Sequence, residues 1–194
     1  MPAAPAKRCP GRPNRVLNKG KRTRITGKET DFSFSLKGRT WEIADGRLNM
    51  PDGEIMTSPV EDTIDGQILF DFPGVLRGHL VHDIKLRWES GELVEASSST
   101  NQDLLRSVLN TDLGASLICK FAIGTKPGIK PFCKDILLDE KIDRTVHIAM
   151  GRSYTSVGGT NQSAIHWDID KNIRQEGEIY LDGDLIYEKG KVLL

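Results

Sequence analysis

Short runs of alternating polar and apolar residues, separated by turns that contain glycine, fill much of the chain after residue 24. Such runs are typical of strands with one buried face. Residues 82–88 and 92–97 form one expected hairpin. Residues 178–181 and 184–187 form a second, across an Asp-Gly pair that tolerates the positive φ of a tight turn. The pattern predicts an α+β domain that is mostly antiparallel β-sheet.

Helical spacing is rarer than strand alternation in this chain. Residues 101–103 open one clear helix, which carries apolar residues at helical spacing and ends over residues 110–114. A second, short helix is expected to start at residue 143 or 145 and to reach Met150, just before a glycine. One clear helix and one or two short ones therefore accompany the sheet.

The charge of the chain is unevenly distributed. The whole sequence balances 27 basic against 27 acidic side chains, but residues 1–24 hold eight basic side chains and no acid. A basic, proline-rich segment with few apolar residues buries too little surface to fold, so we expect residues 1–22 to be a disordered tail and residues 23–194 to be the domain. A basic arm can bind nucleic acid through phosphates. Because no aromatic residues or binding motif accompany this arm, a solvated tail is favoured over a nucleic-acid partner.

Several locations and site types are disfavoured by the sequence. No apolar run approaches the roughly 18 to 20 residues of a membrane-spanning helix, and the N-terminus lacks the apolar core of a secretory signal. The three cysteines are scattered and include no CxxC pair, which argues against a disulfide framework or a structural zinc site. We therefore expect a cytoplasmic protein without a membrane partner.

Two histidines and one aspartate are candidate metal ligands. His166 and Asp168 are two residues apart in an expected strand, so both project from one face, and an imidazole beside a carboxylate suits a divalent cation such as zinc. The alternative is a His-Asp hydrogen bond at a sheet edge. His147 lies between valine and isoleucine, where a core histidine is the alternative to a ligand.

Two acids and one tyrosine complete the candidate set. Glu54 begins an expected strand behind a Pro-Asp-Gly segment, which would present one carboxylate rigidly. Glu140 belongs to a Leu-Asp-Glu-Lys segment that on its own reads as a surface feature. Tyr154 follows the glycine at 151 and could turn its phenol toward the same cleft, the alternative being a core or interface tyrosine. A metal site lined by carboxylates and imidazoles is the chemical hypothesis that these residues support.

Taken together, the ordered blocks resemble the C-terminal catalytic half of the thermophilic metallo-aminopeptidase family, which includes the aminopeptidase T and aminopeptidase S types. The resemblance runs from about residue 23 to the end of the chain. The matching blocks are residues 49–54, 57–59, 111–115, 138–141, 147–154, 163–168 and 178–183.

The resemblance implies a centre of one or two divalent ions (zinc, cobalt or manganese) that removes the N-terminal residue of a peptide substrate. It implies partners as well: a second copy of the chain in a homodimer, or a separately encoded N-terminal half. It also implies that Tyr154 donates to the oxyanion and that Glu140 moves the proton. The metal ligands implied are Glu54, His147, His166 and Asp168.

Two departures from the family pattern bear on activity. Family members carry a metal-binding glutamate before the Phe-Ala-Ile-Gly-Thr segment, and Lys120 occupies that position here. At ~4 Å and an effective dielectric of ~20, one unit charge repels another by about 4 kcal/mol, and a divalent ion doubles this. Family members also begin with an α/β domain, and we expect this chain to lack a counterpart to it. We therefore expect a truncated, impaired aminopeptidase, the alternative being an inactive remnant that serves as a binding or assembly module.

Overall fold

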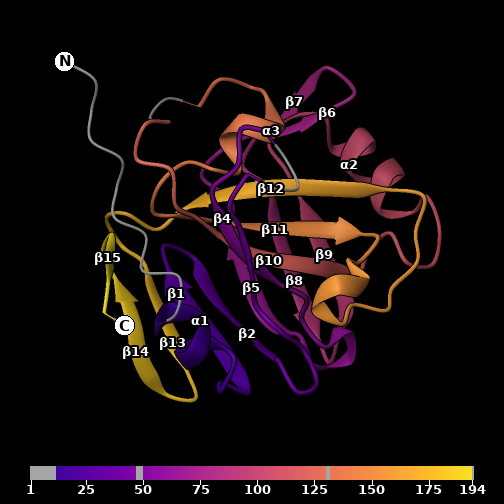
Figure 1. Ribbon diagram of the computed structural model, residues 1–194. Coiled ribbons are helices and arrows are strands. Elements are labelled where there is room, and N and C mark those ends of the chain that lie inside the picture. The colour runs from indigo at the N-terminus through magenta and orange to yellow at the C-terminus, as the bar shows by residue number, and fades with distance from the viewer. Residues whose placement is uncertain (1–11, 47–49, 130–131, 194) are drawn as a thin grey trace.

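The computed structural model describes residues 12–46, 50–129 and 132–193 (Figure 1). Within these residues the strands form an eight-stranded, a five-stranded and a two-stranded sheet, all with antiparallel pairing. The eight-stranded sheet has the order β15-β14-β13-β1-β2-β5-β8-β9. Its strands are β1 (Arg22–Gly27), β2 (Thr30–Ser35), β5 (Asp65–Leu69), β8 (Lys85–Glu89), β9 (Glu92–Ser97), β13 (Glu178–Leu181), β14 (Asp184–Glu188) and β15 (Lys191–Val192).

The five-stranded sheet has the order β12-β11-β10-β4-β3 and positions the candidate site. The described residues also form three α-helices and two 3-10 helices, so the expected α+β class with mostly antiparallel sheet is confirmed. The remaining elements are α1 (Arg12–Leu17), β3 (Glu42–Ala44), β4 (Glu54–Thr57), η1 (Glu61–Thr63), β6 (Gly74–Leu76), β7 (His79–Val81), α2 (Gln102–Leu109), β10 (Ile118–Gly124), α3 (Ile136–Asp139), β11 (Thr145–Gly151), η2 (Thr155–Val157) and β12 (His166–Asn172).

One hydrophobic core joins the two larger sheets. In Figure 1, β10, β11 and β12 run across the strands of the eight-stranded sheet. Alternation in β2 buries Phe32 and Phe34, and the Phe34 ring contacts Phe121 of β10 with centroids 5.2 Å apart. Phe32 packs against Trp88 of β8 at 5.5 Å. Tilted ring pairs of this kind stabilise a core beyond the apolar area that they bury.

Both expected hairpins and the expected long helix are present. β8 and β9 pair across Ser90 and Gly91, and β13 and β14 pair across Asp182 and Gly183. Asp182 and Gly183 have φ of 54° and 95°, the left-handed region that a tight hairpin turn requires. The helix expected after residues 101–103 is α2.

The short helix expected to end at Met150 is wrong, because residues 145–151 form strand β11. All seven residues of β11 are buried, since the strand lies between β10 and β12 and is covered on both faces. A strand of this kind reads as a continuous apolar run, which periodicity alone does not distinguish from a buried helix. The branched side chains of Val146 and Ile148 favour the strand.

The expected tail is shorter than residues 1–22. Residues 12–17 form α1, and Leu17 is 1% exposed within the core. The backbone amides of Lys21 and Arg22 donate to the Asp182 carboxylate at 3.0 and 2.8 Å. The burial of Leu17 and the hydrogen bonds to Asp182 hold the segment in place despite its positive charge. Residues 1–11 lie outside the described residues, so disorder there stays a prediction. None of the helices described is long and apolar enough to cross a membrane.

Candidate metal centre

Four adjacent strands of the five-stranded sheet bring the candidate residues together. Glu54 comes from β4, Lys120 from β10, His147 from β11 and Asp168 from β12. Glu140 follows α3, whose chain turns back onto the sheet. The backbone ties this turn in place, because the Lys126 amide donates to the carbonyl of residue 141 at 3.0 Å.

Small residues leave room for these side chains. Residues directly opposite each other on paired strands share one face of a sheet. Four residues of the cluster are each paired with an alanine or glycine on a neighbouring strand, which leaves room for their side chains above the sheet. The opposing pairs are His147 with Ala122, Lys120 and Asp168 with Ala149, and Glu54 with Gly124.

Three donor side chains converge at one point. Ligand atoms of Glu54, Glu140 and His147 all lie within 4.8 Å of one another. His147 Nε2 is 2.7 Å from Glu54 Oε2 and 3.7 Å from Glu140 Oε2, and Asp168 Oδ1 lies 3.9 Å from the same nitrogen. Carboxylate oxygens with an imidazole form a donor set that suits a divalent cation of the zinc type. Glu54, His147 and Asp168 therefore lie together, and Glu140 joins them.

The Lys120 ammonium group fills the space between these donors. Its Nζ lies 2.9 Å from Glu54 Oε2, 3.2 Å from Glu140 Oε2 and 3.4 Å from Asp168 Oδ1. The side chain is 2% exposed, so it does not reach toward solvent. The donors fit a divalent ion chemically, but such an ion and this ammonium group would occupy the same place.

Lys141 is a second buried cation in the cluster. Its Nζ lies 3.0 Å from Glu54 Oε1 and also contacts Glu140 Oε1, and the side chain is fully buried. The surface interpretation of residues 138–141 is therefore wrong, since Asp139 and Glu140 are buried as well. Opposite charges that neutralise one another make this burial possible.

The pairing sets the charge of each group. Burial opposes the anionic form of Glu54, but the hydrogen bond from His147 and the two ammonium groups hold its pKa well below the usual range. Burial likewise opposes the charge of Lys120, but Asp168, Glu54 and Glu140 hold its pKa well above the usual range. Burial is outweighed for Asp168 too, where Lys120 and His166 lower the pKa. Glu54, Lys120 and Asp168 are thus charged at neutral pH.

His166 and Tyr154 lie at the more exposed end of the cluster. His166 Nε2 faces Asp168 Oδ2 at 3.3 Å, and Nδ1 donates to the Arg152 carbonyl at 2.8 Å. Burial lowers the pKa of His166, but hydrogen bonds to Asp168 and to Cys119 together raise it to about 11. The Tyr154 ring meets the His166 ring edge-on at 5.0 Å and is 41% exposed. Tyr154 is therefore the solvent-exposed neighbour of the cluster.

Asp170 is a further member that the sequence could have indicated. It lies two residues after Asp168, on the same face, and is the register partner of His147. Its Oδ1 is buried without a hydrogen-bond partner among the described residues. Burial, together with the nearby carboxylates, raises the pKa of Asp170 to about 7. Strand alternation from His166 onward is the signal that would have found it.

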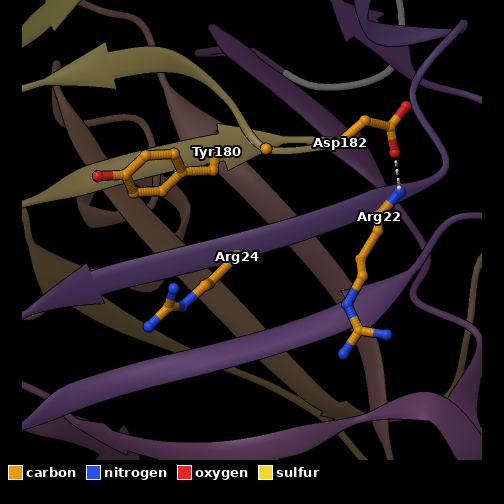
Figure 2. Close-up of a pocket in the computed structure, with 5 residues that line it drawn as sticks. Arg22, Arg24, Tyr180 and Asp182 are labelled. Carbon is orange, nitrogen blue, oxygen red and sulfur yellow. Dashed lines mark hydrogen bonds between the residues drawn. The ribbon is translucent and has the colours of Figure 1, made fainter.

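A separate hollow of about 610 Å³ lies on the eight-stranded sheet (Figure 2). Arg22 and Arg24 of β1, Tyr180 of β13 and the Asp182-Gly183 turn line it. Its polar groups already have partners within the chain: Arg24 binds Asp31 through two hydrogen bonds, Asp182 accepts from the Arg22 backbone amide, and the Arg22 guanidinium donates to Ser33 Oγ at 2.9 Å. None of the donors of the candidate metal centre lines this hollow.

Comparison with known proteins identifies relatives of the whole described domain. Aminopeptidase T of Thermus thermophilus is 31% identical over 191 residues, which cover 84% of this chain and 45% of the relative. Aminopeptidase T of Thermus aquaticus is 29% identical over 184 residues, covering 81% and 43%. The chain thus spans less than half the length of these curated relatives.

Solved structures agree with the fold. Wild-type AmpT from Thermus thermophilus matches with a TM-score of 0.81 and 25% identity over 94% of this chain and 52% of the other. The 2,5-dihydroxypyridine dioxygenase of Pseudomonas putida KT2440 matches with a TM-score of 0.72 at 20% identity, a likeness of fold alone. The family model described as thermophilic metalloprotease (M29) matches residues 11–192. Because this match covers nearly the whole chain, the protein belongs to the thermophilic metalloprotease (M29) family.

Proposed function

We propose that this chain is a metal-dependent aminopeptidase domain that hydrolyses the N-terminal peptide bond of short peptides and whose activity Lys120 impairs. The observation that carries the proposal is the convergence of Glu54, Glu140 and His147 within 4.8 Å in a member of a metalloprotease family. The relatives that match across most of the chain are named aminopeptidases.

In this proposal, four side chains bind metal and a fifth stabilises the oxyanion. Glu54, His147, His166 and Asp168 hold one or two divalent ions, either zinc, cobalt or manganese, and a bound ion supplies Lewis-acid polarisation of the scissile carbonyl. Tyr154 lies at the exposed end of the cluster. Its phenol donates a hydrogen bond to the developing oxyanion, as a positioned donor in a partly desolvated site can.

Glu140 handles the proton. Its carboxylate lies in the same cluster, with Oε2 3.7 Å from His147 Nε2, and it takes a proton from the attacking water and returns it to the leaving amine. Lys120 and Lys141 both contact this carboxylate. These ion pairs engage both oxygens of Glu140 and so compete with the attacking water for the carboxylate, which is one physical reason to expect low turnover.

Metal analysis and peptide hydrolysis test the proposal. The full chain is dialysed against a chelator, and release of the N-terminal residue from short peptides is measured before and after addition of excess cobalt, manganese or zinc. We expect no hydrolysis in chelator, slow hydrolysis once excess metal is added, and none with His147→Ala under either condition. The matched control is His79→Ala, which changes an exposed histidine on β7. Failure of all three metals to give hydrolysis would contradict the proposal.

The position of Lys120 favours a second candidate function, a catalytically silent domain that serves as a binding or assembly module. Its ammonium group lies among the donors, within 3.4 Å of three carboxylates. Lys120→Glu separates the two candidates. A large gain in metal affinity and hydrolysis identifies an impaired enzyme, whereas a folded variant without any gain identifies the module.

The same proposal includes a partner and a location. The domain works as a homodimer or together with a separately encoded N-terminal half, and it works in the cytoplasm. Light scattering on the purified chain measures the oligomeric state. The described cysteines, Cys119 and Cys133, are free thiols, which suits a reducing compartment.

A further inference from the structure

Two ammonium groups bridge the same two carboxylates. Lys120 Nζ contacts Oε2 of both Glu54 and Glu140, at 2.9 and 3.2 Å. Lys141 Nζ contacts Oε1 of both, at 3.0 Å from Glu54. Each carboxylate therefore lies between two cations, and each cation lies between two carboxylates. This is the connectivity of a two-cation centre with bridging carboxylates, built here from side chains of the chain itself.

We propose that Lys120 and Lys141 are the resident cations of this site. Their ammonium groups hold Glu54 and Glu140 in place, so that the folded chain is stable without a divalent ion. A divalent ion enters only where the Lys120 ammonium group leaves. The inference concerns which cation occupies the cluster, so it stands or falls independently of peptide hydrolysis.

Burial makes a cation necessary at this point. Glu54, Glu140 and Asp168 are 3%, 6% and 7% exposed, so water screens their mutual repulsion poorly. Asp168 Oδ1 is buried and has no hydrogen-bond partner among the described residues, yet it lies 3.4 Å from Lys120 Nζ. The Lys120 charge is therefore what this oxygen faces. Structural metal ions commonly supply such a charge and with it part of the folding free energy.

The position of Lys120 in the sheet keeps its side chain in the cluster. All seven residues of β10 are buried between β11 and β4. The ammonium group is met by three carboxylates and lies 5.8 Å from the centre of the Tyr154 ring, a cation–π distance. Shortening this side chain would leave anionic oxygens and an imidazole around a vacated space, which is a donor set that a divalent cation fills.

Lys171 of β12 offers a matched control. It is 1% exposed, and its Nζ binds the carbonyl of Leu69 at 2.7 Å and the Asp71 carboxylate at 3.1 Å. It is thus a buried lysine of the same sheet, and among the residues that the structure describes it has one carboxylate partner at hydrogen-bond distance. Replacing it removes a buried ammonium group without creating a set of converging donors.

The test measures thermal unfolding of the full chain, Lys120→Met and Lys171→Met, each in chelator and in a manganese or zinc titration. We expect the unchanged chain to purify without stoichiometric metal and to melt at the same temperature in chelator. We expect Lys120→Met to melt lower in chelator, to regain stability as metal is added, and to bind manganese at least about tenfold more tightly than the unchanged chain. Lys171→Met should lose stability without any response to metal.

Three results would overturn the inference. They are a stoichiometric divalent ion in the unchanged chain, a lower melting temperature of that chain in chelator, and a folded Lys120→Met that ignores metal. If Lys120→Met does not fold, Lys120→Gln is titrated in its place, and the chelator result on the unchanged chain decides the question. Metal binding by Lys120→Met would support this inference whether or not the variant hydrolyses peptides, whereas failure of the unchanged chain to hydrolyse peptides with any of the three metals would contradict the aminopeptidase proposal alone.

Discussion

Lys120 and Lys171 are both buried in the five-stranded sheet, but their surroundings give them opposite behaviour. Lys120 faces three carboxylates, which outweigh burial and raise its pKa. Lys171 faces backbone carbonyls and the carboxylate of Asp71, so burial dominates and lowers its pKa. Burial alone therefore does not decide whether a lysine acts as a fixed cation. The number of fixed negative charges around the ammonium group decides it.

The largest expected effect is the loss of stability when each lysine is replaced by methionine. Without Lys120 the carboxylates of Glu54, Glu140 and Asp168 stay buried with less compensation, which costs about 3–5 kcal/mol. Without Lys171 the carbonyls lose a donor but Asp71 is partly exposed to water, so the cost is about 1–3 kcal/mol. Urea unfolding in chelator measures both. Equal losses, or a larger loss for Lys171→Met, would break the comparison.

The loss of folding stability on acidification tests how firmly the Lys120 cluster holds the Glu54 carboxylate in its ionised form. Burial raises the pKa of Glu54, but His147 and the two lysines lower it further, so the folded state holds this group ionised where the unfolded chain takes up a proton. The stabilisation is therefore full above the usual pKa of a glutamate and is lost as the pH falls through the folded value.

The variant that isolates this contribution is Glu54→Gln. It should be less stable than the unchanged chain near neutral pH and should lose less stability on acidification, where one group contributes at most about 1.4 kcal/mol per pH unit. Unfolding free energies between about pH 7 and pH 3 give the slopes. Parallel slopes would show that Glu54 is not held by the lysines.

Asp170 extends the comparison to a buried carboxylate whose Oδ1 has no hydrogen-bond partner among the described residues. Burial raises its pKa to about 7, so the unfolded chain loses this proton first and stability falls as the pH rises toward neutrality. Asp170→Asn should remove that fall and stabilise the chain by about 1–2 kcal/mol above pH 7. Melting temperatures at acid and alkaline pH check this, and a destabilised variant at alkaline pH would refute it.

The smallest effect is expected for an ion pair at the surface. Arg24 and Asp31 form a bidentate pair beside the hollow of Figure 2, but their side chains are 55% and 59% exposed. Water and salt screen such a pair, so Arg24→Gln should cost at most about 1 kcal/mol. Urea unfolding at low and high salt measures it. A loss as large as that of Lys120→Met would mean that exposure is not what separates the two regions.

Much of the fold was predictable because strands with one exposed face alternate in sequence. The two hairpins follow from this signal, and α2 follows from its helical spacing. β11 was not predictable in the same way, since burial on both faces removes the alternation. The helix at residues 12–17 was also not predicted. The basic composition of the segment indicated disorder, but the burial of Leu17 in the core stabilises it.

The candidate site was predictable only in part. Alternation places His166 and Asp168 on one face, as the structure shows. Glu54 and His147 were candidates from their local sequence, but a structural reading was the alternative for each, and their roles as metal ligands came from the family resemblance. Lys120 was recognised as a departure, but the direction of its side chain depends on packing. Nothing in the local sequence marks Lys141 as buried. Its partner Glu54 lies far away in the chain, and a lysine beside a glutamate is typical of a surface segment.

The alanines and glycine beneath the cluster have an evolutionary consequence. The small residues beneath the cluster are uncharged, so they favour neither an anion nor a cation above them. They are Ala122, Ala149 and Gly124. A methyl group at position 124 would clash with the carbonyl oxygen of Ile142, so this position resists substitution. Codons for glutamate and lysine differ by a single base. A single-base change in the codon for residue 120 is therefore enough to exchange a negative for a positive charge in the centre while the backbone stays the same.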